Sequence, residues 1–157
     1  MHHIPVRQIM HTNVVTIHPE ELAADAAQLM EEYNIRRLPV VDENDCVVGI
    51  VTDGDVREAE AADGTRSSYE PGVEEEWLSV ADIMTREVIT VGPDATVGEL
   101  ASIFVQYKIG GVPVVEHDAT YPKRHHLIGI VTETDIFALI AAAWQKARKQ
   151  TEAGNQE

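Results

Sequence analysis

Hydrophobic residues recur along the first part of the chain with two different periods. Short apolar runs, largely of β-branched residues, are typical of buried strands and lie at 14–17, 38–42 and 47–52. The polar stretch 43–45 predicts a hairpin between the last two runs. From Leu22 to Tyr33 the apolar residues recur at helical spacing, and a second helix is expected at 53–62. The predicted order is therefore strand, helix, strand, strand, helix.

The same order returns in the second half of the chain, where the sequence repeats itself. The segments 6–10, 14–19, 33–41 and 49–55 align in turn with 80–84, 88–93, 107–115 and 129–135. The second copy has extra residues within 116–127, at its hairpin tip, and its last helix is expected at 133–149. A repeat of this length indicates that one structural unit occurs twice. We expect repeat 1 at 5–61, a linker at 62–78, repeat 2 at 79–146 and a polar C-terminal tail at 147–157.

The first helices of the two copies are predicted to start differently. Thr96 and Glu99 form a capping-box pattern in repeat 2, in which a hydroxyl and a carboxylate satisfy backbone amides at the helix start. Leu22 occupies the position of Thr96 in repeat 1. Because leucine cannot accept a hydrogen bond, that helix is expected to start less cleanly.

Composition and charge narrow the range of partners. The 157 residues are 44% hydrophobic, which is enough for a packed core. Twelve Lys and Arg against 27 Asp and Glu give a formal charge of −15, which argues against nucleic acid or an anionic membrane as a partner. The longest apolar run, 136–144, is too short to cross a bilayer. An anionic small ligand would need a local basic pocket.

The sequence offers little for catalysis or metal binding. The chain contains no Gly-X-Ser-X-Gly, no Gly-X-X-X-X-Gly-Lys-Ser/Thr and no His-Glu-X-X-His motif, so we expect no enzyme activity. The single cysteine, Cys46, allows no intrachain disulfide, so a reducing cytoplasm is expected. Cys46 lies in a predicted hairpin without a nearby histidine, which argues against a hydrolase with a cysteine nucleophile. We expect a mobile basic flap rather than a metal site where cationic residues gather in the second hairpin, at His117, Lys123, Arg124, His125 and His126. Whether His2 and His3 are native or a tag remnant stays open.

The ordered motifs of both copies resemble the cystathionine β-synthase (CBS) domain family. They are Ile-Met, a short strand ending in Thr (Thr16 and Thr90), a Pro-Val-Val strand, and Gly-Ile-Val-Thr-X-X-Asp. The resemblance implies an α/β (α+β) fold of two tandem β-α-β-β-α repeats, packed sheet to sheet with pseudo-twofold symmetry. It also implies a non-catalytic regulatory module whose cleft binds AMP, ADP, ATP, S-adenosylmethionine or a related ligand. No other cofactor is expected.

Two kinds of motif have both a structural and a functional interpretation. The Thr-X-X-Asp pairs beginning at Thr52 and Thr132 resemble helix caps, while the CBS resemblance implies that they bind ribose or phosphate. Arg36 and Arg37 precede a strand and either complement a helix dipole or bind phosphate in a bidentate manner. Repeat 2 has glycines at this corner, which would let a nucleotide approach the backbone closely.

One strong site per chain is expected, with the ligand's phosphates at the arginine corner. The residues that the resemblance implies as ligand-binding are Thr16, Arg36, Arg37, Ile50, Thr52, Asp55, Thr90, Gly110, Gly111, Ile130, Thr132 and Asp135. The alternative is a ligand-independent structural or dimerisation module. Because the last helix is strongly apolar at 136–144, a homodimer is expected in either case. The resemblance implies a stand-alone CBS pair, and its ligand would control a separate enzyme or transporter.

Overall fold

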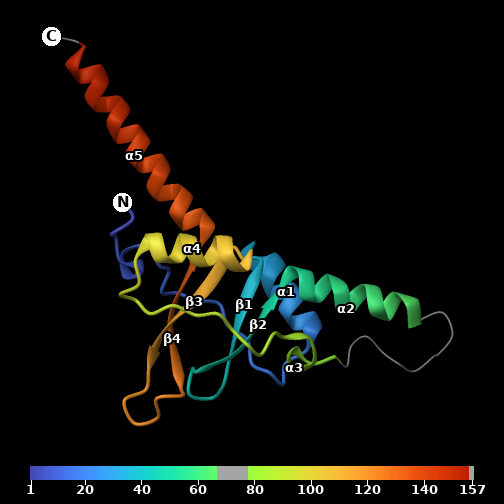
Figure 1. The fold of residues 1–157 in the computed structure, drawn as a ribbon. Helices are drawn as coiled ribbons and strands as arrows, with labels where there is room; N and C mark the ends of the chain where they lie inside the picture. The colour runs from blue at the N-terminus through green and yellow to red at the C-terminus, as the bar shows by residue number, and fades with distance from the viewer. Residues whose placement is uncertain (67–77, 156–157) are drawn as a thin grey trace.

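The structure is a computed structural model that describes residues 1–66 and 78–155, so most of the predicted linker lies outside the described residues. Two β-hairpins lie side by side at its centre, with helices at their ends (Figure 1). In chain order the elements are η1 (Val6–Gln8), α1 (Ala23–Tyr33), β1 (Arg37–Val41), β2 (Val47–Thr52), α2 (Asp53–Arg66), α3 (Val80–Ile83), α4 (Val97–Tyr107), β3 (Gly111–His117), β4 (His125–Thr132) and α5 (Glu133–Gly154).

The two predicted hairpins are confirmed, and they match each other in register. β1 pairs antiparallel with β2, and β3 pairs antiparallel with β4. Each ladder shifts by one residue at the equivalent place, between Val40 and Val41 and between Val114 and Val115. The same irregularity in both copies shows that the sequence repeat is also a structural repeat.

The predicted strands at 14–17 and 88–91 are wrong in extent. Each joins its hairpin through one residue, in the parallel bridges Ile17 with Val40 and Val91 with Val114. The Ile17 amide donates to the Pro39 carbonyl at 3.2 Å, and its own carbonyl accepts from the Val41 amide at 3.0 Å. The residues before Ile17 leave the sheet to run past the cavity described below, so no further rung forms.

The leading segment of each repeat packs in the other half of the molecule. Val6 is fully buried with Val91 and Leu100 of repeat 2, whereas Val80 is fully buried in the repeat 1 core, which includes Ile17. Burial of these side chains stabilises the joined halves, since each apolar side chain removed from water contributes about 1.5 to 3 kcal/mol. Each structural half therefore consists of one sequence repeat without its first segment, together with the first segment of the other repeat.

Glycines make this exchange possible. A Cβ on Gly129 would lie 2.8 Å from Met10 Sδ and 3.0 Å from the His11 carbonyl oxygen. A Cβ on Gly49 would overlap Met84 Sδ in the equivalent contact. The leading segments approach the central strands so closely that a side chain at either position would push them away.

The helix starts follow the capping predictions. In α4 the Glu99 amide donates to Thr96 Oγ1 at 3.2 Å, and Glu99 Oε2 accepts from the Thr96 amide at 3.0 Å. At the start of α1 only the carboxylate half of this box is made, from the Leu22 amide to Asp25 Oδ2 at 3.2 Å. The difference confirms that repeat 1 begins its first helix with one capping bond fewer.

The last helix of each repeat is longer than predicted. α2 continues to Arg66, into the expected linker, and α5 continues to Gly154, through most of the expected polar tail. In α5 the added turns are supported by an ion pair between Arg148 and Glu152 and by the Thr151 hydroxyl, which donates to the Ala147 carbonyl at 3.0 Å. α5 extends away from the rest of the protein, and none of its side chains is buried (Figure 1).

Candidate functional site

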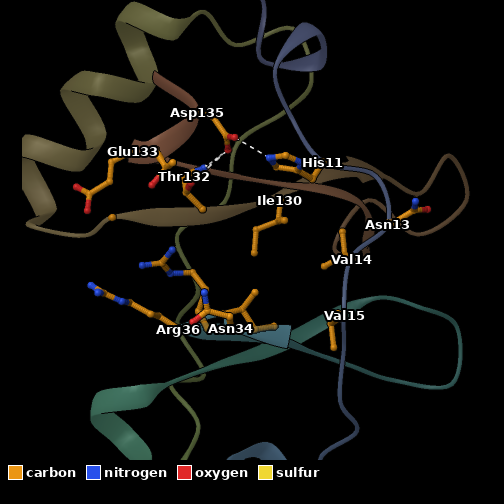
Figure 2. A pocket seen from close by; sticks show the side chains of 14 residues that line it. His11, Asn13, Val14, Val15, Asn34, Arg36, Ile130, Thr132, Glu133 and Asp135 are labelled. Carbon is orange, nitrogen blue, oxygen red and sulfur yellow. Dashed lines mark hydrogen bonds and ion pairs between the residues drawn. The ribbon is translucent and has the colours of Figure 1, made fainter. Parts of the chain in front are cut away.

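A cavity of about 630 Å³ lies between the two repeats. Four segments line it: the chain before Ile17, the corner between α1 and β1, the corner before β3, and the end of β4 with the start of α5 (Figure 2). The lining residues are His11, Asn13, Val14, Val15, Asn34, Ile35, Arg36, Arg37, Gly110, Ile130, Thr132, Glu133, Thr134 and Asp135. The volume lies within the range of pockets that hold small molecules and cofactors.

The arginine corner is built by the end of α1. Asn34 closes that helix in the left-handed conformation, with φ 52°, and so turns the chain toward β1. The Arg36 carbonyl accepts a hydrogen bond from the Asp53 amide at 2.8 Å, which joins this corner to the start of α2. The Arg36 side chain is exposed and Arg37 is half-buried, so both guanidinium groups lie at the cavity edge.

The Arg37 side chain reaches across to repeat 2. A Cβ on Gly111 would lie 2.5 Å from Arg37 Nη1, and a Cβ on Gly110 would lie 3.3 Å from Arg37 Nη2 and 3.0 Å from Glu133 Oε1. Burial lowers the pKa of the Arg37 guanidinium, while the nearby Glu133 and Asp53 carboxylates act in the opposite direction. The space above Gly111 therefore holds an arginine from the other repeat, where the sequence suggested room for a ligand.

The opposite end of the cavity presents a carboxylate at the start of α5. Asp135 Oδ2 accepts from the Thr132 amide at 2.8 Å and from Thr132 Oγ1 at 3.3 Å. Asp135 Oδ1 lies 2.6 Å from His11 Nε2 (Figure 2). The Asp135 side chain is only 11% exposed, whereas that of His11 is 66% exposed. Asp135 is thus held by three hydrogen bonds, and His11 covers it from the solvent side.

The equivalent carboxylate of repeat 1 makes the cap but not the histidine contact. Asp55 Oδ2 accepts from the Thr52 amide at 2.9 Å and from the Thr52 hydroxyl at 3.0 Å, and the Asp55 amide donates back to Thr52 Oγ1 at 3.2 Å. The predicted capping role of this pair is confirmed. Thr85 occupies the position that His11 has in the other half, since both bridge the isoleucine of the neighbouring strand.

The structure brings only part of the predicted residue set to this cavity. The cavity is lined by Arg36, Arg37, Gly110, Ile130, Thr132 and Asp135. Gly111 lies beneath Arg37. The other predicted residues do not line it: Ile50, Thr52 and Asp55 lie at the equivalent place in repeat 1, and Thr16 and Thr90 precede the bridging residues Ile17 and Val91.

Sequence reasoning missed several polar lining residues, namely His11, Asn13, Asn34, Glu133 and Thr134. The repeat alignment carried one available signal, because it pairs His11 with Thr85 and so exposes a chemical difference between the copies. The contact between His11 and Asp135, however, depends on the exchanged leading segment, which no local pattern predicts.

The prediction that Cys46 has no histidine nearby is wrong. Cys46 Sγ lies 3.4 Å from His126 Nδ1, and His126 Nε2 lies 2.8 Å from Asp118 Oδ2. The two hairpin tips meet there, because the Leu127 amide donates to the Asp45 carbonyl at 3.0 Å. The second hairpin is therefore tied to the first at His126, and the mobility expected of its basic flap stays a prediction.

The surroundings of Cys46 do not make a reactive thiolate. Burial, followed by the nearby Asp42 carboxylate, raises the pKa of the Cys46 thiol. The hydrogen bond from His126 lowers the pKa of Asp118 to about 2, and the same bond raises the pKa of His126. Within residues 1–66 and 78–155 no group of three or more His, Cys, Asp or Glu side chains is arranged to hold a metal ion.

None of the helices in the described parts of the chain is long and apolar enough to span a membrane. The fold and cavity define a class of protein: two repeats, each with a central hairpin, that exchange their leading segments and have a cavity between them. The chain matches the CBS domain at residues 6–62 and 80–142, and it belongs to this family as a tandem CBS domain pair. CBS domain pairs are generally regulatory rather than catalytic.

Solved structures of similar sequence are also CBS pairs. The CBS domain pair of protein MJ0100, in complex with 5′-methylthioadenosine and S-adenosyl-L-methionine, has 32% identity and a TM-score of 0.72 over 88% of this chain and 97% of that chain. CBSX2, in complex with AMP, has 27% identity and a TM-score of 0.69 over 92% of this chain and 98% of that chain.

Relatives by sequence include both enzymes and small proteins. An inosine-5′-monophosphate dehydrogenase of Korarchaeum cryptofilum is 38% identical over 125 residues, which cover 80% of this chain and 22% of the enzyme. A CBS domain-containing protein of Dictyostelium discoideum is 31% identical over 141 residues, which cover 86% of this chain and 90% of that protein. The chain spans less than a quarter of the length of the first two enzymes that it matches.

Proposed function

We propose that the cavity binds an adenine nucleotide or a related adenosyl ligand, and that the protein is a non-catalytic regulator whose two halves respond to that ligand. The observation that carries the proposal is the pairing, in one cavity, of cationic and anionic groups at opposite ends. Arg36 lies at one end of the cavity, and Asp135 lies at the other with Thr132 (Figure 2). Arg37 also lines the cavity, where it reaches over Gly111. A nucleotide carries complementary groups in the same order, with anionic phosphate at one end of a sugar that bears hydroxyls.

The arginine end suits phosphate for electrostatic reasons. The chain has a formal charge of −15, so its long-range field repels an anion, although salt screens charges beyond about 8 Å. Attraction must then come from direct contacts, and guanidinium groups form charge-assisted, bidentate bonds to phosphate oxygens. The Arg36 side chain is exposed and able to reorient toward a ligand.

The Asp135 end suits a sugar. The Asp135 carboxylate, which is largely shielded from solvent, can accept hydrogen bonds from hydroxyl groups, and the capping bonds from Thr132 hold it in one orientation. Ile130 and Val14 add apolar surface to the same cavity, against which a purine base can pack (Figure 2). The adenosyl ligands bound by the CBS pairs of MJ0100 and CBSX2 support the same assignment for this chain.

A second candidate function, dimerisation without a ligand, is favoured by the exposed face of α5. Phe137, Ile140 and Trp144 are 60%, 50% and 59% exposed, and their spacing of three and four residues places them on one side of the helix. Such a stripe is costly to leave in water, and a second copy of the chain would cover it in a closed twofold pair. The two functions are compatible, since a ligand sensor can also be a homodimer.

Thermal unfolding with a ligand panel tests the proposed function. A ligand that binds only the folded state stabilises it by about 2.7 kcal/mol at one hundred times its Kd. We expect AMP, ADP, ATP or S-adenosylmethionine to raise the melting temperature, and inorganic phosphate at the same concentration to serve as the control for anion effects. If no adenosyl compound raises it while the protein sediments as a dimer, the ligand-independent function is correct. The cytoplasmic location and the regulated enzyme or transporter stay predictions.

A further inference from the structure

His11 is fixed at the edge of the cavity by its backbone. Its amide donates to the Ile130 carbonyl at 2.9 Å, and its carbonyl accepts from the Ile130 amide at 2.9 Å. These two bonds attach the leading segment of repeat 1 to β4, five residues before Asp135. The imidazole reaches Asp135 at 2.6 Å from this anchor, although most of the ring is exposed to solvent.

The contact uses up hydrogen-bonding capacity on Asp135. An ionised carboxylate has about four acceptor positions, two on each oxygen, and donates nothing. Two positions on Oδ2 are taken by the amide and hydroxyl of Thr132. One position on Oδ1 is taken by His11 Nε2, which must be the donor. A single position therefore remains for a ligand hydroxyl.

The first repeat shows the same carboxylate without this restriction. Asp55 is bonded by Thr52 in the same way as Asp135 is by Thr132. Among the described residues no side chain other than that of Thr52 donates to Asp55, and Thr85 stands where His11 stands in the other half. Asp55 therefore serves as the internal reference for a carboxylate that no histidine contacts. Threonine is the natural replacement for His11, because Thr85 occupies the equivalent position in the other half.

We propose that His11 is a specificity-determining residue, which limits Asp135 to one hydroxyl of a bound sugar and so lets the cavity accept a nucleotide that lacks one ribose hydroxyl. This inference rests on the proposed function. With His11 present, only one of the two ribose hydroxyls donates to Asp135. Without it, both do, and each contributes a hydrogen bond to a charged group.

Calorimetry with AMP, 2′-deoxy-AMP and 3′-deoxy-AMP tests the proposal on the wild-type protein and on His11→Thr. In the wild type we expect at least one deoxynucleotide to bind as tightly as AMP. In His11→Thr we expect both to bind about tenfold more weakly than AMP, the fold-change of one hydrogen bond to a charged group. An unchanged melting temperature in the absence of ligand will show that the variant folds, since the His11 backbone bonds do not depend on its side chain.

A double-mutant cycle separates the effect of His11 on Asp135 from a change in pocket shape. In an Asp135→Ala background, His11→Thr should leave the ratio of AMP to deoxynucleotide affinity unchanged. The reason is that this background has no carboxylate whose acceptor position the removal of His11 could free. A change of this ratio in that background overturns the proposal. The proposal is also overturned if the ratio of AMP to deoxynucleotide affinity is the same in the wild type and in His11→Thr. In that case the proposed function still stands, provided that AMP binds. If AMP does not bind the wild type at all, the proposed function fails together with the inference.

Discussion

We expect Arg36 and Arg37 to contribute unequally to ligand binding, and replacing each arginine separately tests this. Arg36→Ala removes an exposed guanidinium at the cavity edge. If that group bonds phosphate, its loss should weaken AMP binding by about 1.5 to 3 kcal/mol, which is tenfold or more in Kd. Adenosine has no phosphate, so its affinity should stay the same within about twofold.

Arg37→Ala should have a wider effect. Arg37 lies over Gly111 and near the Glu133 carboxylate, so its removal takes a nearby cation away from Glu133 and leaves a gap between the repeats. Stability should therefore fall as well as AMP affinity, because the stem of an arginine packs as an apolar group. Adenosine binding should weaken in Arg37→Ala but not in Arg36→Ala.

Gly111→Ala provides a check that leaves both arginines in place. The added methyl would lie 2.5 Å from Arg37 Nη1, so the guanidinium must move. We expect AMP affinity to fall in this variant as it does in Arg37→Ala. Calorimetry with AMP and adenosine on the three variants is the assay. Equal losses for the two ligands in Arg36→Ala would refute the phosphate contact, and no loss for either would mean that Arg36 lies on the surface without a role.

Three further predictions concern other parts of the molecule. Asp135→Ala should weaken AMP binding tenfold or more and lower the free energy of unfolding by about 1 kcal/mol. The matched Asp55→Ala should lower only the free energy of unfolding, by the same amount, since Asp55 does not line the cavity. Equal losses of AMP affinity in the two variants would contradict this. Trp144→Glu should convert a dimer to the 17.3 kDa monomer in sedimentation, and a variant that stays dimeric would exclude α5 as the interface. The bond between His126 and Asp118 raises the pKa of His126 and lowers that of Asp118 to about 2, so its stabilisation is full between about pH 4 and pH 6.5. It is lost as pH rises through the raised pKa of His126 or falls through that of Asp118, and urea unfolding across pH should show no such dependence in His126→Gln.

Local pattern is sufficient to predict much of this fold. The hairpins, the capping box at Thr96 and the cap at Thr52 each depend on residues close together in the chain, so spacing and residue type predict them directly. The internal repeat also predicts the CBS family, because the ordered motifs, including Thr-X-X-Asp, occur in both copies. Local pattern fails at helix ends: α5 continues to Gly154, because propensity and side-chain pairs within the helix outweigh a polar composition.

The cavity depends on contacts that sequence separation hides. His11 and Asp135 are 124 positions apart, and they meet because the first segment of repeat 1 packs in the core of repeat 2. Arg37 likewise crosses to Gly111, and Cys46 meets His126 across 80 positions. These pairings follow from burying apolar side chains such as Val6 between the halves. Since that burial is non-directional, only the packed arrangement of the whole chain selects which polar groups come together.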